Sequence, residues 1–327
     1  MTVIVRSFAK INLGLRIGAA REDGFHELLT VYQTIGLHDV IRVSVGRGSG
    51  IEIRCTDPRV PRDESNTCFR IVEKALGALK IKSRVVVEIE KRLPVQGGLG
   101  GASANAVVAL VGLERALKKF LPASERLRIA AEVGSDLPLF LVGGTVLGVG
   151  RGEQVYPLQD LPAMACVVVT PEAGVSTPKA FAEWDRRMRG AAELTLPEAS
   201  DRMVELGRGL SAWLSEKYSG APSDFLARRG RAENPLLWLV RAGIENDFER
   251  VVFPEYPELS EGKRALERAG AVYASLSGSG STLYGLFRSR AEAAKAVGRL
   301  RTAGWAARAT ITLTRRAYWK KFLVSSV

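Results

Sequence analysis

A glycine-rich loop between a strand-like run and a helix-like run is the feature that most constrains this chain. Glycine fills four of the five positions from Gly97 to Gly101, after the Val/Ile-rich run Val85–Glu90 and before an amphipathic stretch that starts at Ser103. Glycines adopt positive φ and let a backbone approach an anion closely. A helix N-terminus adds free N–H groups and a positive dipole end. The loop therefore predicts a triphosphate cradle.

The spacing of this loop excludes two familiar nucleotide-binding motifs. No Gly-Lys-Ser/Thr follows it, so it is not a Walker A loop, and its glycines do not have the Rossmann spacing. A simple glycine-rich turn with Ser103 as a helix N-cap remains the structural alternative.

The chain is long for a single core, so two domains are expected from its 327 residues. Strands and helices without a regular βαβ period favour an α+β fold. The predicted strands are Thr2–Ser7, Lys10–Ile17, Val40–Val45, Ile51–Cys55, Val85–Glu90, Thr145–Val149, Cys166–Thr170, Val272–Leu276, Thr282–Phe287 and Ala306–Thr312. The predicted helices are Asn66–Leu79, Ser103–Phe120, Glu258–Ala269 and Ala291–Thr302, the last two in a ferredoxin-like arrangement. We expect an N-terminal domain over 1–160, a C-terminal domain over 161–327 and a candidate variable insertion over 185–233.

Composition and charge narrow the class of protein. No apolar run approaches the roughly 18 residues of a membrane span, and the first residues lack a secretory signal, so we expect a cytoplasmic protein. Three cysteines without metal-ligand spacing and only two histidines exclude a histidine-rich metal site. The net charge of +12 favours anionic partners. Because no stripe interleaves arginines with aromatics, we expect a small phosphorylated molecule and no nucleic acid.

Further motifs complete a resemblance to the GHMP kinases, a superfamily that includes homoserine and mevalonate kinases. The loop resembles their second motif, Ser7–Leu13 the first and Leu276–Thr282 the third. Five ordered segments then resemble the 4-diphosphocytidyl-2-C-methyl-D-erythritol kinase family in particular: Ala9–Leu13, Asp23–Leu28, Gly134–Phe140, Gly174–Pro178 and Glu245–Glu249. The resemblance implies a two-domain GHMP-kinase fold, with an N-terminal phosphate-loop domain and a ferredoxin-like C-terminal domain. It also implies ATP-dependent phosphorylation of the substrate's 2-hydroxyl in the non-mevalonate isoprenoid pathway.

The resemblance assigns the chemistry to Lys10 and Asp136. Asp136 would be the catalytic base, and Lys10 would orient it and offset charge on the transferred group. Residues two apart on a strand face the same side, so Asn12 is expected beside Lys10. Without the resemblance, Lys10 fits a solvated strand lysine and Asp136 fits an N-cap before Leu137-Pro138.

The resemblance assigns ATP and Mg²⁺ to the glycine-rich loop. The expected ATP-binding residues are Pro94, Val95, Gln96, Gly97, Gly98, Leu99, Gly100, Gly101, Ala102, Ser103 and Ala104. Mg²⁺ is expected to bridge the phosphates, with Ser103 as the candidate protein ligand. The family continues with further serine after this position, whereas this chain has Ala104.

The resemblance also assigns a cytosine site and a third phosphate contact. Phe25 and Phe181 would stack on the two faces of the base, and His26 would hydrogen-bond its edge. Backbone amides of the third motif would lie near the transferring phosphate; the residues are Gly278, Ser279 and Gly280. Phe25 departs from the family, which has tyrosine there. Without the resemblance, these residues fit core side chains and a tight β-turn.

Two alternative functions stay open at this point. Another GHMP kinase, of the homoserine or mevalonate type, would not need the element Gly24-Phe25-His26. A basic nucleic-acid-binding protein would have no use for Lys10, Asp136 and a phosphate loop together. We expect a monomer or a homodimer.

Overall fold

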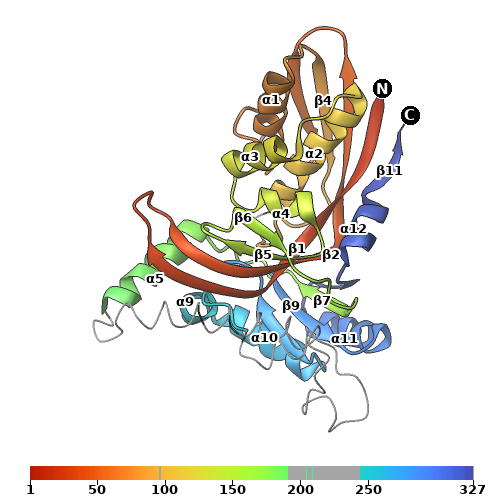
Figure 1. Cartoon of the computed structure of the whole chain (residues 1–327). Helices are drawn as coiled ribbons and strands as arrows, with labels where there is room; N and C mark the ends of the chain where they lie inside the picture. The colour runs from red at the N-terminus through yellow and green to blue at the C-terminus, as the bar shows by residue number, and fades with distance from the viewer. Residues whose placement is uncertain (96, 191–203, 205–207, 209–243, 327) are drawn as a thin grey trace, which may run out of the picture.

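The computed structural model describes residues 1–327 except 96, 191–203, 205–207, 209–243 and 327. Gln96 and most of the candidate insertion over 185–233 therefore lie outside the described residues. The described elements form two sheets with helices packed on their faces (Figure 1). This arrangement confirms the expected two-domain α+β fold class.

The first sheet has the order β11-β1-β2-β4-β3, and β5 and β6 extend it from the other half of β2. Its strands are β1 (Thr2–Ala20), β2 (His26–Gly46), β3 (Gly50–Cys55), β4 (Arg84–Glu90), β5 (Thr145–Val149), β6 (Gln154–Pro157) and β11 (Leu323–Ser326). The β3–β4 pair is parallel because helix α1 (Thr67–Leu79) carries the chain back between them, whereas the other pairs are antiparallel.

Strand β1 corrects one expectation from the sequence. The runs Thr2–Ser7 and Lys10–Ile17 belong to a single strand, whose register against β2 shifts between Phe8 and Lys10. A bulge of this kind inserts a residue and breaks the alternation of apolar and polar positions, so the pattern suggested two strands. The expected strand Val40–Val45 is likewise only the end of the much longer β2.

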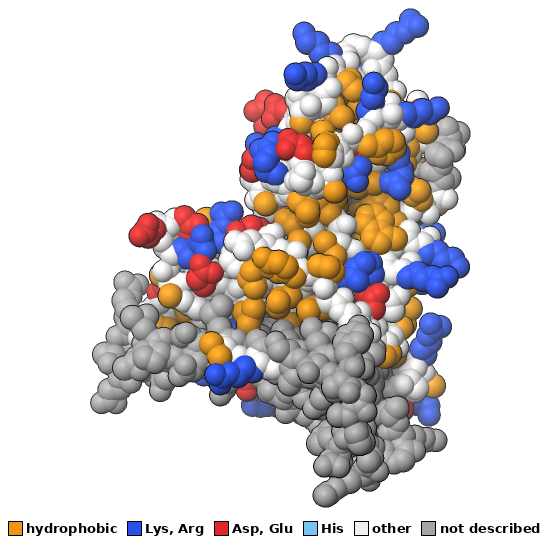
Figure 2. All heavy atoms as spheres, viewed as in Figure 1, with side chains coloured by type: hydrophobic (Ala, Val, Ile, Leu, Met, Phe, Trp, Pro, Cys, Tyr) orange, Lys and Arg blue, Asp and Glu red, His pale blue; other side chains and the backbone are white. Residues whose placement is uncertain are grey.

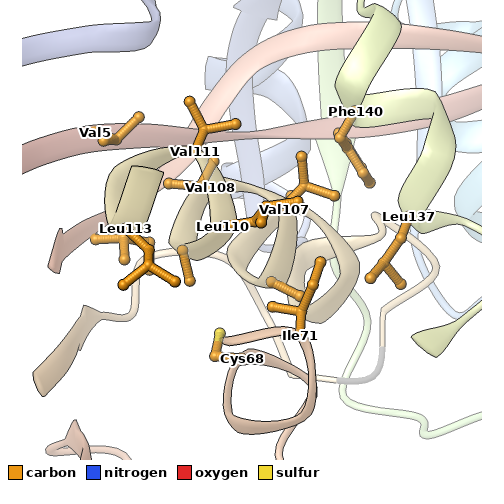
Figure 3. Close-up of a cluster of buried hydrophobic side chains, with 14 of the residues drawn as sticks. Val5, Cys68, Ile71, Val107, Val108, Leu110, Val111, Leu113, Leu137 and Phe140 are labelled. Atoms are coloured by element: carbon orange, nitrogen blue, oxygen red, sulfur yellow. The ribbon is translucent and has the colours of Figure 1, made fainter. Parts of the chain in front are cut away.

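Helices α1, α2 (Gly101–Leu117) and α4 (Leu137–Val142) pack against this sheet, and α3 (Ala123–Val133) packs on α1 and α4. In Figure 3, Val107, Leu110 and Leu113 of α2 lie in the cluster with Val5 of β1 and Ile71 of α1. Helix α2 starts two residues earlier than expected. It also ends three residues earlier, because the next residue adopts a left-handed conformation with φ of 53°.

The second sheet has the antiparallel order β10-β7-β9-β8. Its strands are β7 (Ala165–Val169), β8 (Tyr273–Leu276), β9 (Leu283–Phe287) and β10 (Ala307–Ile311). The associated helices are α5 (Thr177–Gly190), α9 (Glu249–Glu255), α10 (Pro257–Arg268) and α11 (Arg290–Thr302). Leu259 and Leu266 of α10 and Leu300 of α11 share a buried core with Leu283 and Phe287 of β9.

The C-terminal tail returns to the first sheet. Helix α12 (Arg315–Phe322) buries Tyr318 and Phe322 in the core of the first domain, and β11 then pairs with the start of β1. In Figure 1 the two ends of the chain accordingly lie side by side. The expected C-terminal domain over 161–327 therefore does not include α12 and β11, which pack with the first domain. A division near residue 160 remains a proposal for the rest of the chain.

The two sheets meet along the middle of β1 and β2. Leu15 forms a β-bridge with Asn246, and the Leu313 N–H donates to the Thr34 carbonyl at 2.8 Å. The phosphate loop joins this junction because the Thr282 N–H donates to the Gly97 carbonyl. No helix among the described residues is long and apolar enough to cross a membrane.

Candidate active site

The glycine-rich loop needs glycine at two positions for steric reasons. Gly98 and Gly100 have φ of 73° and 67°, a region that disfavours side chains. A Cβ at Gly98 would lie 2.1 Å from the Ser277 carbonyl oxygen. A Cβ at Gly100 would lie 3.0 Å from both Lys10 Cγ and Phe140 Cζ. The loop therefore passes against the third motif on one side and against Lys10 on the other.

Helix α2 begins inside this loop. Gly100 occupies the N-cap position, no side chain caps the helix, and Ser103 lies within the first turn. Ser103 is therefore not the N-cap of α2. The first N–H groups of α2 have no carbonyl partner within the helix, as at every helix start, and so they suit an anion.

A cavity of about 500 Å³ opens beside the loop. This volume is in the range of small-molecule sites. The loop residues Pro94, Val95 and Gly97–Ser103 line it, together with Asn105. The opposite wall was not predicted from the sequence; it consists of Arg59, Val60, Pro61, Ser65, Asn66, Thr67, Cys68, Ile89, Lys91 and Thr177. Most of these residues come from the connection between β3 and α1, the start of α1 and the end of β4, and nothing in their local pattern indicates a ligand. Thr177 is the exception, because it starts α5 and belongs to the segment Gly174–Pro178 that resembles the family.

A buried carboxylate, that of Asp39, fixes the backbone just before the glycine-rich loop. Asp39 is fully buried and accepts hydrogen bonds from Lys91 Nζ at 2.6 Å, from the N–H groups of Arg92 and Leu93 at 2.7 Å each, and from Asn105 Nδ2 at 3.1 Å. This one group ties the chain before the loop to the helix after it. Sequence reasoning missed Asp39, because its partners lie more than fifty residues away along the chain.

Lys10 and Asp136 meet at the inner end of the loop. Lys10 is 3% exposed, and its Nζ lies 2.6 Å from Asn12 Oδ1 and 3.4 Å from Asp136 Oδ2. Asp136 occupies the N-cap position of α4, as expected, but its side chain makes no capping hydrogen bond. Its Oδ1 instead accepts from the Tyr32 hydroxyl at 3.0 Å.

Tyr32 is a site residue that sequence reasoning missed. It lies on β2 directly opposite Asn12, and burial together with the Asp136 carboxylate raises its pKa well above the usual value. Tyr32 is therefore a neutral hydrogen-bond donor that orients Asp136. Two glycines make room for it, since a Cβ at Gly148 or Gly152 would lie 2.4 Å from its side chain.

The third motif, Leu276–Thr282, lies between β8 and β9 of the second sheet and comes close to Lys10. Gly278 has φ of 58°, and a Cβ there would lie 3.5 Å from Lys10 Nζ. Ser277 Oγ donates to the Gly98 carbonyl at 2.9 Å, and the hydroxyls of Ser279 and Thr177 are 2.7 Å apart. The Gly280 N–H is used within the turn, where it donates to the Ser277 carbonyl. Of the three expected amides, that of Gly280 therefore already has a partner.

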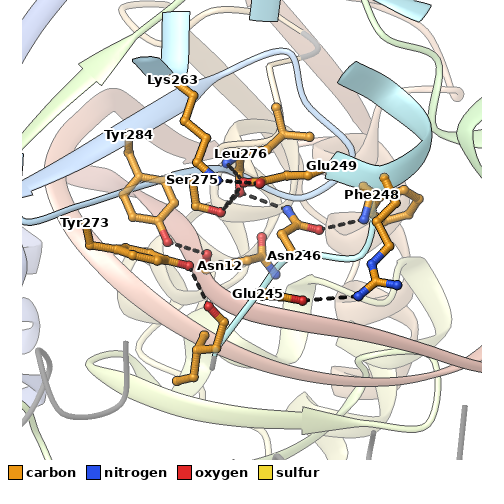
Figure 4. A network of polar contacts seen from close by, with 12 residues as sticks. Asn12, Glu245, Asn246, Phe248, Glu249, Lys263, Tyr273, Ser275, Leu276 and Tyr284 are labelled. Carbon is orange, nitrogen blue, oxygen red and sulfur yellow. Dashed lines mark hydrogen bonds and ion pairs between the residues drawn. The ribbon is translucent and has the colours of Figure 1, made fainter. Parts of the chain in front are cut away.

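A polar network fixes the third motif to β1 (Figure 4). Asn246 Nδ2 donates to the carbonyls of Leu276 and Gly278, both at 2.8 Å. Glu249 accepts from the Leu276 N–H at 2.9 Å, and the Tyr284 hydroxyl donates to the Asn12 carbonyl at 2.8 Å. The third motif and the strand that carries Lys10 are thereby held in one frame.

The residues expected to bind cytosine lie near one another but not as a sandwich. His26 stacks on Phe181, with ring centroids 4.9 Å apart and an interplanar angle of 11°. His26 Nε2 also lies 2.7 Å from Asp185 Oδ1. Phe25 is 48% exposed and contacts the guanidinium of Arg151. One face of Phe181 is therefore already occupied by His26.

The charged side chains are dispersed on the face drawn in Figure 2. Lys and Arg gather near the top and along one edge, while hydrophobic side chains occupy the middle. No continuous basic stripe crosses the described part of this face. The absence of a nucleic-acid partner remains a prediction.

Family models match both halves of the chain. The GHMP kinases N terminal domain matches residues 66–144, and the GHMP kinases C terminal model matches residues 234–305. Among solved structures, a 4-(cytidine 5'-diphospho)-2C-methyl-D-erythritol kinase superposes with a TM-score of 0.69 at 28% identity, covering 95% of this chain and 99% of the other. A homoserine kinase from Cytophaga hutchinsonii has a TM-score of 0.68 at 18% identity, over 96% of this chain and 95% of its own, and shows the shared fold.

Curated relatives give the family within this superfamily. The 4-diphosphocytidyl-2-C-methyl-D-erythritol kinase of Solibacter usitatus is 37% identical over 88% of this chain and 81% of its own length. The protein of the same name from Acaryochloris marina is 35% identical over 90% of each chain. The chain therefore belongs to the 4-diphosphocytidyl-2-C-methyl-D-erythritol kinase family of the GHMP kinases.

Proposed function

We propose that this chain transfers the γ-phosphoryl group of ATP to the 2-hydroxyl of 4-diphosphocytidyl-2-C-methyl-D-erythritol, a step of the non-mevalonate isoprenoid pathway. One observation carries the proposal beyond family membership. The pair Lys10–Asp136 lies where the glycine-rich loop and the third motif meet, with Tyr32 bonded to Asp136. Phosphoryl transfer needs such alignment and charge neutralisation more than covalent chemistry.

Asp136 is the proposed base for the substrate hydroxyl. The Tyr32 hydroxyl holds Oδ1, so Oδ2 is the oxygen placed to accept the proton, 3.4 Å from Lys10 Nζ. General base catalysis of this kind contributes about 100- to 10,000-fold in rate. The Lys10 ammonium is buried and anchored by Asn12, so its charge acts at short range on the transferred group.

The cavity beside the loop is the proposed ATP site, and its donor set fits Mg²⁺. Ser103 lines the cavity, and so does Asn105, whose buried Oδ1 has no hydrogen-bond partner in the described structure. No group of three or more His, Cys, Asp or Glu able to hold a metal occurs among the described residues. Mg²⁺ keeps several waters and binds largely through substrate phosphates, so one or two protein oxygens suffice. When bound, the ion would neutralise charge on the phosphates.

Phe25, His26 and Phe181 are the proposed cytosine-binding residues. Phe25 lies in the β1–β2 connection, His26 begins β2 and Phe181 lies on α5, on the same side of the molecule as Asp185, whose carboxylate contacts His26. A histidine that stacks on a phenylalanine and bonds a carboxylate has a fixed ring plane, which suits recognition of a flat base edge.

A substrate panel tests this function. ADP release should be measured at saturating ATP with three acceptors: 4-diphosphocytidyl-2-C-methyl-D-erythritol (called the cytidyl-erythritol from here on), homoserine and mevalonate. We expect turnover with the cytidyl-erythritol and only background with the other two. Preferred turnover of homoserine or mevalonate would instead assign another GHMP activity to the chain.

The remaining proposals concern partners and compartment. We propose a cytoplasmic enzyme, a monomer or homodimer, that acts on small molecules. The three cysteines are buried and free, which supports a reducing compartment. RNA retention in a filter-binding assay at moderate salt would contradict the small-molecule proposal.

A further inference from the structure

Asn246 belongs to a segment, Glu245–Glu249, that stands out in the sequence but has no part in the chemistry proposed above. Its side chain is buried, and the Phe248 N–H donates to its Oδ1 at 3.0 Å. Because an amide oxygen only accepts, this bond fixes which way the side-chain amide is turned. Nδ2 then donates to the carbonyls of Leu276 and Gly278, both at 2.8 Å. One side chain therefore holds two carbonyls of the third motif.

The bond to the Gly278 carbonyl also sets the direction of the next N–H group. In a planar trans peptide, the carbonyl and the N–H point in opposite directions. The peptide between Gly278 and Ser279 is trans, and its carbonyl points at Asn246. The Ser279 N–H therefore points away from Asn246.

The turn that carries Ser279 borders the proposed active site. Ser279 Oγ lies 2.7 Å from Thr177 Oγ1, and Thr177 lines the cavity beside the glycine-rich loop. A Cβ at Gly278 would lie 3.5 Å from Lys10 Nζ. The peptide that Asn246 orients thus lies between the cavity wall and the buried ammonium.

The Ser279 N–H has no partner in the part of the chain that the structure describes. Within the turn, the Ser277 N–H donates to the Thr282 carbonyl at 2.9 Å, and the Gly280 N–H donates to the Ser277 carbonyl at 3.1 Å. The N–H groups of Gly278 and Ser279 donate no hydrogen bond to a described residue. Buried N–H groups are nearly always paired, and Ser279 is only 7% exposed. A free N–H group at this place suits an anionic ligand.

We propose that Asn246 is a positioning residue that aims the Ser279 N–H at the transferred phosphoryl group. This inference rests on the proposed function. A donor that is fixed before the reaction stabilises charge on the transferring oxygens without having to reorganise. Asn246 itself is buried and would act only through the backbone, so its effect should appear in kcat.

Asn246→Asp tests this role because it keeps the shape of the side chain and the acceptor for the Phe248 N–H but removes both donors. A carboxylate would then face the carbonyls of Leu276 and Gly278, and the peptide would lose its orientation. We expect kcat to fall by about 10- to 100-fold, somewhat less than for complete removal of such a donor. The KM values for ATP and the cytidyl-erythritol should stay within about 2-fold, because an interaction made only in the transition state changes kcat and kcat/KM together.

Asp247→Asn is the matched control. Asp247 is the next residue and is also buried, but it holds β1, accepting from Arg16 Nη1 at 3.0 Å and from the Ile17 N–H at 2.9 Å. Its loss should lower the melting temperature and leave kcat unchanged. An equal loss of kcat in both variants would show that the segment only supports the fold, and it would overturn the inference.

A binding measurement that needs no acceptor gives a second readout. ADP would be titrated calorimetrically with Mg²⁺, with and without aluminium fluoride, whose anion mimics the transferring phosphoryl group. For Asn246→Asp we expect unchanged affinity for ADP and an affinity for ADP with aluminium fluoride that is lower by about 10-fold or more. Equal weakening of both ligands would contradict the positioning role.

A milder variant covers the case in which Asn246→Asp does not fold. Asn246→Ser carries no charge and can still donate one hydrogen bond, so kcat should fall about 5- to 10-fold at unchanged KM. Unchanged kcat in a folded variant of Asn246 would overturn the inference. Failure of the wild-type chain to use the cytidyl-erythritol would instead contradict the proposed function, and the aluminium fluoride titration would still test Asn246.

Discussion

At the proposed phosphoryl-transfer end of the site, Lys10 is buried and its ammonium already contacts Asn12 and Asp136. At the proposed nucleoside end, Phe25 is half exposed, and His26 and Phe181 contact each other rather than leaving a slot between rings. The first end sets its side chains in a backbone frame of positive-φ glycines, a helix start and strand pairing. The second is built by side chains on a hairpin connection and on α5.

This difference matches what the relatives share. The homoserine kinase structure has the same fold at 18% identity, so the backbone frame persists while the sequence changes. A phosphoryl-transfer end fixed by backbone can serve many alcohols. We propose that substrate choice depends on side chains such as Phe25 and His26, which can change without disturbing the frame.

The largest expected effect comes from Asp136→Asn. The amide keeps the shape and can still meet Tyr32, but it cannot accept a proton. We expect kcat to fall by about 100-fold or more with little change in melting temperature. Single-turnover phosphoryl transfer, measured by rapid quench, checks this; a variant with near-normal turnover would remove Asp136 from the role of base.

A matched pair of glycine variants tests whether the backbone of the glycine-rich loop shapes the proposed phosphoryl-transfer end. Gly100→Ala puts a side chain at φ of 67° and against Lys10, whereas Gly101 has no positive φ and a Cβ there would lie 3.2 Å from its nearest neighbour, Lys91 Nζ. We expect ATP affinity to fall on the order of 100-fold for Gly100→Ala, because a strained conformation costs up to about 3 kcal/mol. Gly101→Ala should be much milder. Equal affinities by calorimetry would mean that the loop is an ordinary turn.

At the nucleoside end, His26→Ala should separate the two substrates. Loss of a hydrogen-bond partner for a desolvated base edge predicts a rise of about 30-fold in KM for the cytidyl-erythritol. The KM for ATP should stay the same, because His26 is not among the residues that line the cavity beside the loop. A lower melting temperature with both substrates weakened together would identify His26 as a core residue.

The smallest expected effect is that of Tyr32→Phe. Asp136 would lose one orienting hydrogen bond, worth about 1 kcal/mol, so kcat should fall about 5- to 10-fold at unchanged KM. Tyr318→Phe is the control, since it removes another buried hydroxyl, which donates to the Phe140 carbonyl at 2.7 Å. The control should lower stability and leave kcat intact; the same kcat loss in both variants would argue against a positioning role for Tyr32.

A feature could be predicted from the sequence where the residues that produce it lie close together along the chain. The loop and helix α2 were predicted because their glycines and apolar periodicity lie within one stretch of sequence. Tyr32 was not, because its partner Asp136 is 104 residues away and nothing local distinguishes it from a strand tyrosine. The return of β11 to β1 was missed for the same reason, since strand pairing between the two ends of a chain leaves no local pattern.

The most direct test of the comparison removes the nucleoside from the substrate. Turnover of 2-C-methyl-D-erythritol 4-phosphate, which keeps the alcohol but lacks the cytidyl group, should be compared with that of the cytidyl-erythritol at saturating ATP. Base stacking and edge contacts are each worth about 1–3 kcal/mol, so kcat/KM should be at least about 30-fold lower for the truncated alcohol. Equal kcat/KM for the two alcohols would contradict the account, because the nucleoside end would then contribute nothing to substrate choice.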